Sequence, residues 1–469
     1  MNQMNNRNII FIMLDTVRAD VLKPYGGSAD VPNLGRLASN GVKYNMAIAP
    51  GTYTLPSHLS LFLGKRVKSI PELRRTGMKF SDLMADPFLK KSRYNTSNLT
   101  IAQVMEYFGY KSALFSNNPF VSESTGLATG FSHVSNLFID NKINANNARV
   151  KAVLNLIQND HTRRGFVDLA YRIASVIPDK RLDNMYLSMR KRLNRHFSRE
   201  YGYYDIDKGA GTTNRQLSEY LRHSRNAKNF IFINYMEGHE GYPTNLITSD
   251  YVEQDKWLHM TGKASREDLG TTKEAYIKRI EYLDRKMGEA ISMMGKGGIL
   301  DDATLIVSSD HGQAFMEHGH MFHNVYPYNE VTRVPLIIAN FRNGKQIKRR
   351  KRIDHPFSLT DLNKVITGNE PDSVKPVFSD HIGITEVWDT HLLQLFRKRS
   401  PNAEMIYRKK IEQDRHVTAI YGDGHKLIHY YGKRPDELYS LDDLEESSNL
   451  MDRKRSLALK ILAYNTMGA

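Results

Sequence analysis

Short apolar runs alternate along the chain with stretches whose apolar residues recur at helical spacing. The runs at 8–14, 229–236, 303–310 and 334–339 have the length and continuous apolar character of buried strands. Apolar strands separated by helices predict an α/β fold, with a mostly parallel central sheet sandwiched by helices. The other predicted elements are helices at 31–41, 99–110 and 274–294 and a strand that opens the segment 111–118.

Two regions depart from this alternation. Residues of about 140–205 are rich in Asn and Arg, and basic side chains outnumber acidic ones there. This composition predicts an inserted helical lid, although a solvated helical decoration fits it equally well. From about residue 372 the pattern changes to short strands around "GDG" and a final helix, which predicts a small α+β subdomain over 372–469 behind a main domain over 1–371.

Composition and charge narrow the chemistry. The chain of 469 residues contains no cysteine, which excludes disulfides, thiolate metal sites and a cysteine nucleophile. A net charge of +15 favours an anionic substrate or surface, and a basic but functionally silent surface is equally consistent with it. No nucleic-acid-binding motif accompanies the charge, so a nucleic-acid partner is not expected. The apolar run 9–14 is too short to span a membrane, and a cytoplasmic location is expected.

Polar residues with metal-binding chemistry follow three of the predicted strands. Asp15, His239 and Asp310 each come just after a strand, and ligands of parallel sheets bind beyond the carboxyl ends of the strands. The carboxylate of Asp310 and the imidazole of His311 together suit a divalent cation such as Mn, Zn or Mg. Asp15 could supply a third ligand, although these residues alone leave the metal role open.

The segment "GTYTLPSHLSLFLGK" places hydroxyl groups before an apolar helix. Thr54 could complete the site, because metal coordination is one of the few ways to activate a threonine hydroxyl as a nucleophile. Pro56 would fix the turn, and Ser57 would cap a helix that starts at Leu59. From these residues alone, helix capping is the favoured interpretation of the hydroxyl groups.

Several motifs, taken in order along the chain, resemble the sulfatase-like branch of the alkaline phosphatase superfamily. Residues 8–65 are similar to the opening segment of that family, in which an aspartate after the first strand binds metal and a C/S-x-P-S-R loop carries the nucleophile. A histidine segment, the second metal pair, a further histidine stretch and a C-terminal signature follow as "NFIFINYMEGHEGYP", "VSSDHGQAFMEHG", "HNVYPYNEVTRVPLII" and "ELYSLDDLEESSNL". The resemblance covers the chain apart from the insertion, and it implies the fold and the place of the site.

The resemblance also implies roles for individual residues. It implies one divalent ion (Mn, Zn, Mg or Ca) held by Asp15, Thr54, Asp310 and His311. It further implies Thr54 as the nucleophile, His239 and His323 as catalytic histidines, and substrate contacts from Arg18, His58 and Asn117.

Departures from the sulfatase pattern affect the expected chemistry. Thr54 stands where sulfatases convert Cys or Ser to formylglycine, so no formylglycine is expected. His58 replaces the arginine of the motif, Asn117 aligns with a sulfate-contacting lysine, and Thr16 replaces a second aspartate. Thr54 together with His311, in place of the usual asparagine, resembles the phosphotransferase members of the superfamily.

The lost positive charge favours a singly charged ester. The preferred hypothesis is hydrolysis or transfer of a phosphate diester or phosphonate ester, of a small molecule, glycan or lipid, through a phosphothreonine. Hydrolysis of a sulfuric ester by unmodified Thr54 is the first alternative, and non-catalytic binding of an anionic glycan is the second. The basic surface also allows a peripheral contact with an anionic surface, and the sequence does not determine the oligomeric state.

Overall fold

The structure is a computed structural model that describes ten stretches of the chain. They are residues 7–64, 99–123, 125–136, 207–224, 227–239, 266–323, 326–366, 378–382, 416–430 and 434–467. The insertion predicted at about 140–205 and the subdomain boundary predicted near 372 lie outside the described residues. Within these stretches, no helix combines the length and the apolar character that a membrane crossing requires.

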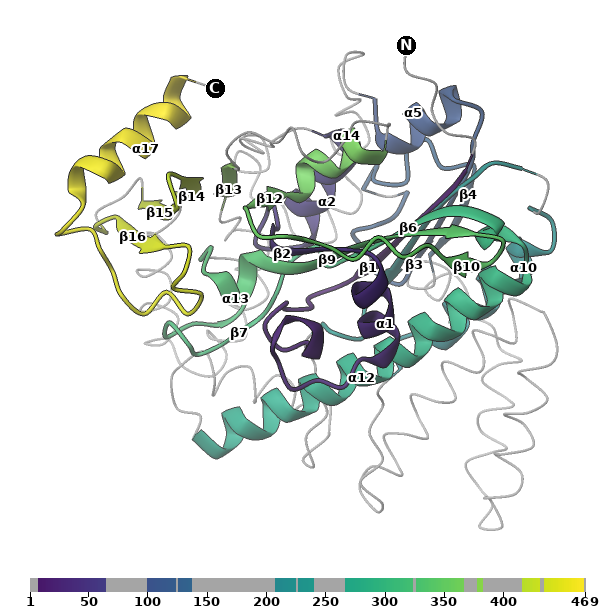
Figure 1. Ribbon diagram of the computed structural model, residues 1–469, viewed down its shortest axis with the longest axis horizontal. Helices are drawn as coiled ribbons and strands as arrows, with labels where there is room; N and C mark the ends of the chain where they lie inside the picture. The colour runs from purple at the N-terminus through teal and green to yellow at the C-terminus, as the bar shows by residue number, and fades with distance from the viewer. Residues whose placement is uncertain are drawn as a thin grey trace, which may run out of the picture.

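The described residues form a ten-stranded sheet with β1 (Asn8–Leu14), β5 (Asn229–Tyr235) and β6 (Asp302–Ser308) in its middle (Figure 1). The strand order is β11-β2-β9-β6-β1-β5-β3-β4, with β10 paired to β9 and β12 paired to β2. The remaining strands are β2 (Val42–Ile48), β3 (Lys111–Ser116), β4 (His133–Asn136), β9 (Arg333–Arg342), β10 (Lys345–Gln346), β11 (Lys351–Ile353) and β12 (Phe357–Ser358).

Most strand pairs in the sheet are parallel, which confirms the predicted α/β class. β1 runs parallel to β5 and β6, and β3 runs parallel to β4 and β5. The exception at the centre is β9, which is antiparallel to both β6 and β2. The described part of the β6–β9 connection carries the small hairpin of β7 (Ala314–Phe315) and β8 (Met321–Phe322) and the helix α13 (Asn329–Thr332). A parallel return needs a long crossover helix, so this connection brings the chain back antiparallel.

Helices cover both faces of the sheet (Figure 1). On β1, Ile10 and Ile12 pack toward one group of helices, whereas Phe11 and Met13 pack toward the other. Burial on both faces explains why this strand is continuously apolar, and each buried side chain contributes about 1.5–3 kcal/mol relative to exposure. The first group is α1 (Pro32–Asn40), α10 (Ala210–Leu221) and α12 (Arg266–Lys296), and the second is α2 (Thr54–Leu63), α5 (Ile101–Tyr107) and α14 (Leu362–Ile366).

A second, antiparallel sheet forms the C-terminal part of the molecule. Its strand order is β13-β14-β15-β16, and the helix α17 (Arg455–Met467) packs against it (Figure 1). The predicted "GDG" hairpin joins β14 and β15, where Asp423 and Gly424 have φ of 48° and 71°. Positive φ at both central residues is the geometry of a tight hairpin turn. The strands are β13 (Phe378–Ile382), β14 (His416–Gly422), β15 (His425–Tyr430) and β16 (Glu437–Ser440).

A buried ion pair within the C-terminal part of the molecule makes contact with α13, which precedes β9 of the main sheet. Lys426 of β15 lies 2.6 Å from Glu446 Oε1, and both side chains are 1% exposed. Lys426 also donates to Asn329 Oδ1 at 3.1 Å, and the Asn329 backbone N–H donates to Glu446 Oε2 at 2.7 Å. Burial by itself would lower the pKa of Lys426, but the charge of Glu446 raises it, so the lysine stays charged.

Removal of one partner of this pair should destabilise the fold strongly. Lys426→Met leaves the Glu446 carboxylate buried without its cation, and we expect a loss of about 3–5 kcal/mol in the free energy of unfolding. The matched control is Lys460→Met, which breaks the exposed pair with Asp423 and should cost about 1 kcal/mol or less. Chemical denaturation of both variants checks the prediction, and equal losses would contradict it.

Candidate active site

The parallel register of β1 and β6 brings two aspartates together. Asp15 directly follows β1, Asp310 follows β6 after one residue, and the two strands are paired neighbours. Ligand atoms of Asp15, Asp310 and His311 all lie within 4.8 Å of one another, and all three residues are fully buried. His311 Nδ1 lies 3.0 Å from the Gly312 carbonyl oxygen, which leaves Nε2 for a metal ion.

The cluster has the properties of a cation site. Asp310 Oδ2 is buried and has no hydrogen-bond partner among the described residues. Burial raises the pKa of Asp310, and the negative charge of Asp15 raises it further. A divalent cation would relieve both the unpaired oxygen and the repulsion, and two carboxylates with one imidazole are suitable ligands for it. The residues therefore fit the metal ion that the resemblance implies.

A second group of possible ligands lies near the C-terminal sheet. His318, Glu330 and Glu446 also offer ligand atoms within 4.8 Å of one another. However, Glu446 is already paired with Lys426 and accepts a backbone N–H from Asn329. Because this carboxylate is neutralised by the protein itself, the cluster of Asp15, Asp310 and His311 is the better cation site.

Thr16 holds the two aspartates in place. Its hydroxyl donates to Asp15 Oδ1 at 2.7 Å, and its backbone N–H donates to Asp310 Oδ1 at 3.1 Å. The φ of Thr16 is 64°, a conformation that is strained for a β-branched residue. Where the sulfatase pattern has a further acidic ligand, this chain thus has two hydrogen-bond donors that orient the carboxylates.

Thr54 lies at the start of a helix and beside the cluster. It is the first residue of α2 and is 3% exposed. Its Oγ1 lies 3.5 Å from His311 Nε2. The N-terminus of a helix favours negative charge, so this position stabilises a threonine alkoxide in addition to any bound cation.

The expected helix cap is wrong. α2 begins at Thr54 and not at Leu59, and no side chain caps its N-terminus. Pro56 therefore lies in the first turn, where no backbone N–H is needed. Ser57 lies inside the helix, and its hydroxyl donates to the Asp310 carbonyl oxygen at 2.6 Å. This bond ties α2 to the loop that carries Asp310 and His311.

Asn118, which the sequence analysis did not identify, links Thr54 to Asp15. Its Nδ2 donates to Asp15 Oδ2 at 2.6 Å and to Thr54 Oγ1 at 3.3 Å. Its Oδ1 accepts the backbone N–H of Phe120 at 2.8 Å, which fixes the side chain. The only indication in the sequence was the pair of asparagines that follows the strand β3.

The neighbouring Asn117 makes different contacts. Its Oδ1 accepts a hydrogen bond from Thr213 of α10 at 3.1 Å. Its Nδ2 is buried and has no hydrogen-bond partner among the described residues. The two asparagines thus serve different elements, and a substrate contact for Asn117 stays a prediction.

The predicted histidines gather in one group. The ring centroids of His311 and His323 are 4.4 Å apart, and those of His239 and His323 are 5.2 Å apart. His323 Nδ1 lies 2.8 Å from Gln313 Oε1, and this contact fixes the orientation of the ring. Gln313 is a second residue that the sequence analysis did not identify.

His58 lies inside α2 and contacts the site from the apolar core. It is fully buried, with its ring 5.9 Å from that of Phe62 and 6.0 Å from that of Phe232. Its Nδ1 lies 2.9 Å from the Thr54 carbonyl oxygen and 3.6 Å from Asp310 Oδ2. A substrate contact for His58 stays a prediction, and the geometry places this side chain against the first turn of α2 and Asp310.

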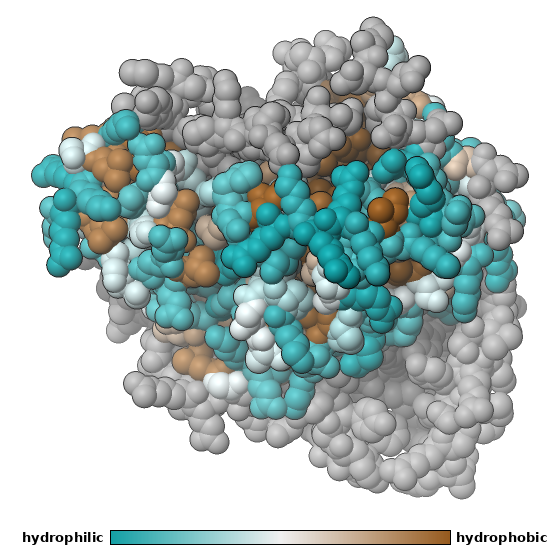
Figure 2. Space-filling view, in the orientation of Figure 1, coloured by the Kyte–Doolittle hydropathy of each residue, from teal (hydrophilic) through white to brown (hydrophobic). Residues whose placement is uncertain are grey.

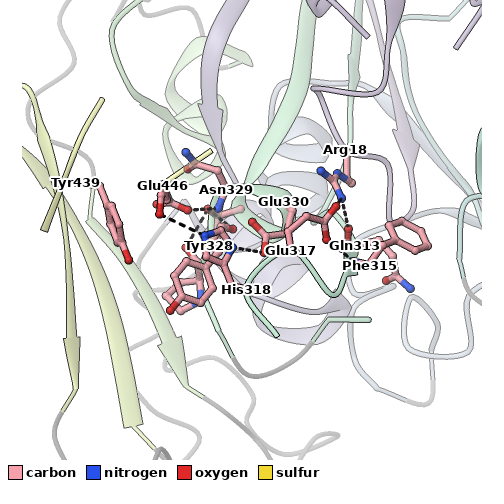
Figure 3. A network of polar contacts seen from close by, with 12 residues as sticks. Arg18, Gln313, Phe315, Glu317, His318, Tyr328, Asn329, Glu330, Tyr439 and Glu446 are labelled. Carbon is pink, nitrogen blue, oxygen red and sulfur yellow. Dashed lines mark hydrogen bonds and ion pairs between the residues drawn. The ribbon is translucent and has the colours of Figure 1, made fainter. Parts of the chain in front are cut away.

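Arg18 is engaged by carboxylates. Its guanidinium donates to both oxygens of Asp20, at 2.8 and 2.5 Å. It also donates to Glu317 and, at 3.1 Å, to the Gln313 carbonyl oxygen (Figure 3). These contacts anchor the loop after β6, and a substrate contact for Arg18 stays a prediction.

The same loop is anchored again farther along (Figure 3). His318 Nδ1 lies 2.7 Å from Glu330 Oε1, and its ring stacks on Tyr328 at 3.9 Å. His318 Nε2 lies 3.4 Å from the Glu446 carbonyl oxygen, near the C-terminal sheet. The segment that carries His323 therefore lies close to two fixed points.

Two glycines let the backbone approach closely around the site. A Cβ atom at Gly312 would lie 2.2 Å from the Glu330 carbonyl oxygen. A Cβ atom at Gly238 would lie 2.5 Å from the Asp15 carbonyl oxygen. Both distances are shorter than any real carbon contact, so only glycine fits next to His311 and His239.

The fold and its strand-end cluster define the class of the protein as an α/β protein with a candidate metal site at the carboxyl ends of its parallel strands. The Sulfatase family profile matches residues 7–364, and the chain therefore belongs to the sulfatase family.

Relatives and solved structures agree with this placement. An N-acetylglucosamine-6-O-sulfatase of Bacteroides thetaiotaomicron is 23% identical, over 95% of this chain and 83% of the relative. The structure of a phosphonate monoester hydrolase of Agrobacterium radiobacter superimposes with a TM-score of 0.60 at 16% identity, over 98% of this chain and 94% of that one. A 2-O GAG sulfatase superimposes with a TM-score of 0.58 at 14% identity, over 98% and 90% of the two chains.

Metal affinity should depend on the first acidic cluster. We expect Asp310→Asn to weaken Mn²⁺ binding by about 10–100-fold or more, because it removes a ligand charge. Glu330→Gln, in the second cluster, is the matched control and should leave the affinity unchanged. Titration calorimetry on metal-free protein measures both. If only Glu330→Gln weakened Mn²⁺ binding, the result would assign the ion to the cluster of His318, Glu330 and Glu446 instead.

Loss of the Asn118 donor should slow the reaction. We expect Asn118→Asp to lower kcat by about tenfold or more, because it removes the donor to Thr54 and adds charge beside Asp15. The aspartate keeps the acceptor for the Phe120 N–H, so the loop should stay folded, whereas Asn118→Ala loses both contacts. Steady-state kinetics and thermal unfolding separate the two effects. An unchanged kcat in Asn118→Asp would show that Asn118 supports only the loop.

Proposed function

We propose that this sulfatase-family hydrolase cleaves or transfers a singly charged ester, with a phosphate diester or phosphonate ester preferred, and that Thr54 is the nucleophile. The observation that carries the proposal is the position of Thr54 Oγ1. It lies at a helix N-terminus, 3.5 Å from His311 Nε2 and 3.3 Å from Asn118 Nδ2. A hydroxyl so placed has surroundings that would stabilise its alkoxide and direct it to an ester.

A divalent cation held by Asp15, Asp310, His311 and the Thr54 oxygen would supply Lewis-acid stabilisation of negative charge, and Mn, Zn, Mg and Ca are the candidates. In the proposed mechanism the Thr54 hydroxyl loses its proton to solvent, and its oxygen forms a bond to phosphorus while the bond to the leaving alcohol breaks on the opposite side. Asn118 orients that oxygen, and His239 and His323 donate to the equatorial or leaving oxygens. Water or an acceptor alcohol then discharges the phosphothreonine.

The charge around Thr54 supports a singly charged substrate. His58 and Asn117 stand where the sulfatase motifs carry arginine and lysine. Arg18 cannot replace these cations, because Asp20 and Glu317 already bind its guanidinium. A phosphate monoester with two negative charges would therefore be less well neutralised than a diester or phosphonate monoester.

A sulfuric ester is the second candidate substrate, and the sequence similarity of this chain to sulfatases supports it. The relative from Bacteroides thetaiotaomicron is named for sulfate removal from N-acetylglucosamine. A sulfate monoester also carries a single negative charge, so a site without the motif arginine and lysine suits it as well. The names of the relatives also support a glycan ester as the substrate class. A cytoplasmic location stays a prediction.

A panel of nitrophenyl esters decides between the candidates. We expect kcat/KM with Mn²⁺ to be highest for bis(4-nitrophenyl) phosphate or 4-nitrophenyl phenylphosphonate, lower for 4-nitrophenyl sulfate, and lowest for 4-nitrophenyl phosphate. Highest activity on the sulfate would favour the second candidate, and highest activity on the phosphate monoester would contradict the charge argument.

The nucleophile is tested on the preferred ester of that panel. Thr54→Ala should lower kcat by about a thousandfold or more, because no oxygen remains to form the covalent intermediate. Thr54→Ser keeps a hydroxyl at the same position and should retain part of the activity. Mass spectrometry of the quenched enzyme should show an adduct on the peptide that contains Thr54. Full activity of Thr54→Ala would end the assignment.

A further inference from the structure

Residues 342–352 form a strongly basic segment that we call the cationic strap. Seven of its eleven residues are Lys or Arg, and none is acidic. All seven of these side chains are exposed. They are Arg342, Lys345, Lys348, Arg349, Arg350, Lys351 and Arg352.

The backbone holds the strap in a fixed path across the end of α1. The Ile347 N–H donates to the Asn340 carbonyl oxygen at 2.7 Å, and the Arg349 N–H donates to the Asn40 carbonyl oxygen at 2.8 Å. The Lys351 N–H donates to the Gly41 carbonyl oxygen at 3.1 Å. The charges are therefore presented as an ordered array, in contrast to a loose basic tail.

Positive charge accumulates beside the strap. Lys43 lies close to it, and its pKa is lowered first by burial and then by the like charge of Arg352. Asp354 is a nearby counter-charge, and it pairs with Arg352 at 2.7 Å. The balance stays strongly positive, and a broad hydrophilic area covers the segment between β10 and β12 in Figure 2.

The strap begins at the end of the sheet opposite the active site. In the antiparallel register of β6 and β9, Arg342 lies opposite Asp302, the first residue of β6. Asp310 lies just beyond the last residue of β6. Eight residues of extended chain separate these positions by about 26 Å. An anion bound at that end is therefore not the ester that reacts at Thr54.

The composition of the strap favours a lipid surface over nucleic acid. Ile347 lies between its cations and is 38% exposed. Clustered Lys and Arg attract anionic headgroups, and an exposed apolar side chain among them can enter the interface. Single-stranded nucleic-acid sites add aromatic side chains for base stacking, and the strap contains none.

We propose that the cationic strap docks this protein on an anionic phospholipid surface. The lysine and arginine side chains contact the phosphate headgroups, and Ile347 enters the headgroup layer. The candidate active site lies toward the other end of the strands, away from the docked strap. This inference does not depend on which ester the enzyme cleaves.

Vesicle cosedimentation tests the proposal. We expect the full chain to bind phosphatidylcholine vesicles that contain phosphatidylserine, and not vesicles of phosphatidylcholine alone. The variant K348Q/R349Q/R350Q should bind the anionic vesicles with an affinity that is lower by about tenfold or more. The matched control is the variant R453Q/K454Q/R455Q, which removes the same charge from exposed positions at the start of α17. This control should leave binding to the anionic vesicles unchanged.

A further variant separates a lipid surface from a soluble polymer. Ile347→Ser should weaken binding to the anionic vesicles but not to immobilised heparin. Equal losses in both triple variants would show that net charge, and not the strap, drives binding, and would overturn the proposal. Binding to heparin or RNA without binding to vesicles would also overturn it. Unchanged thermal unfolding and unchanged activity on a soluble nitrophenyl ester confirm that the variants are folded.

Discussion

The site depends on two carboxylates that are buried side by side. β1 and β6 are paired and parallel, so Asp15 and Asp310 emerge at the same edge of the sheet. Their mutual repulsion in a buried setting is unfavourable, and the surrounding residues are arranged around it: Thr16 donates to both, and Asn118 donates to Asp15. A cation would complete this arrangement electrostatically. Thr54, His311, His323 and the strained backbone at Thr16 all lie around this pair.

The loop after β6 connects this centre to the rest of the molecule. Gly312 allows the backbone to pass close to Glu330, and Arg18 and His318 anchor the loop on either side of Glu317. The buried pair of Lys426 and Glu446 then ties the C-terminal sheet to α13. The small sheet therefore supports the segment that carries His323, although none of its described residues belongs to the cluster of Asp15, Asp310 and His311.

The apolar pattern predicted most of the central fold. Strands at 8–14, 229–236 and 303–310 lie within one or two residues of their places, because strands buried on both faces must be continuously apolar. The reversal of β9 was not predicted, since an apolar run carries no information on strand direction. The helix α2 starts before Leu59, and the Ser57 hydroxyl bonds to the Asp310 carbonyl oxygen, a contact between distant residues, in place of capping.

The sequence by itself determined the chemistry that is available: strand-end aspartates, a threonine before an apolar helix, several histidines and no thiol. It also indicated the family, because its motifs keep their order along the chain. Only the tertiary structure decided which neighbours share the site. Asn118 and not Asn117 contacts Thr54, and Arg18 is bound by carboxylates. Such choices depend on side-chain direction and on contacts between residues far apart in the chain, which local sequence does not encode.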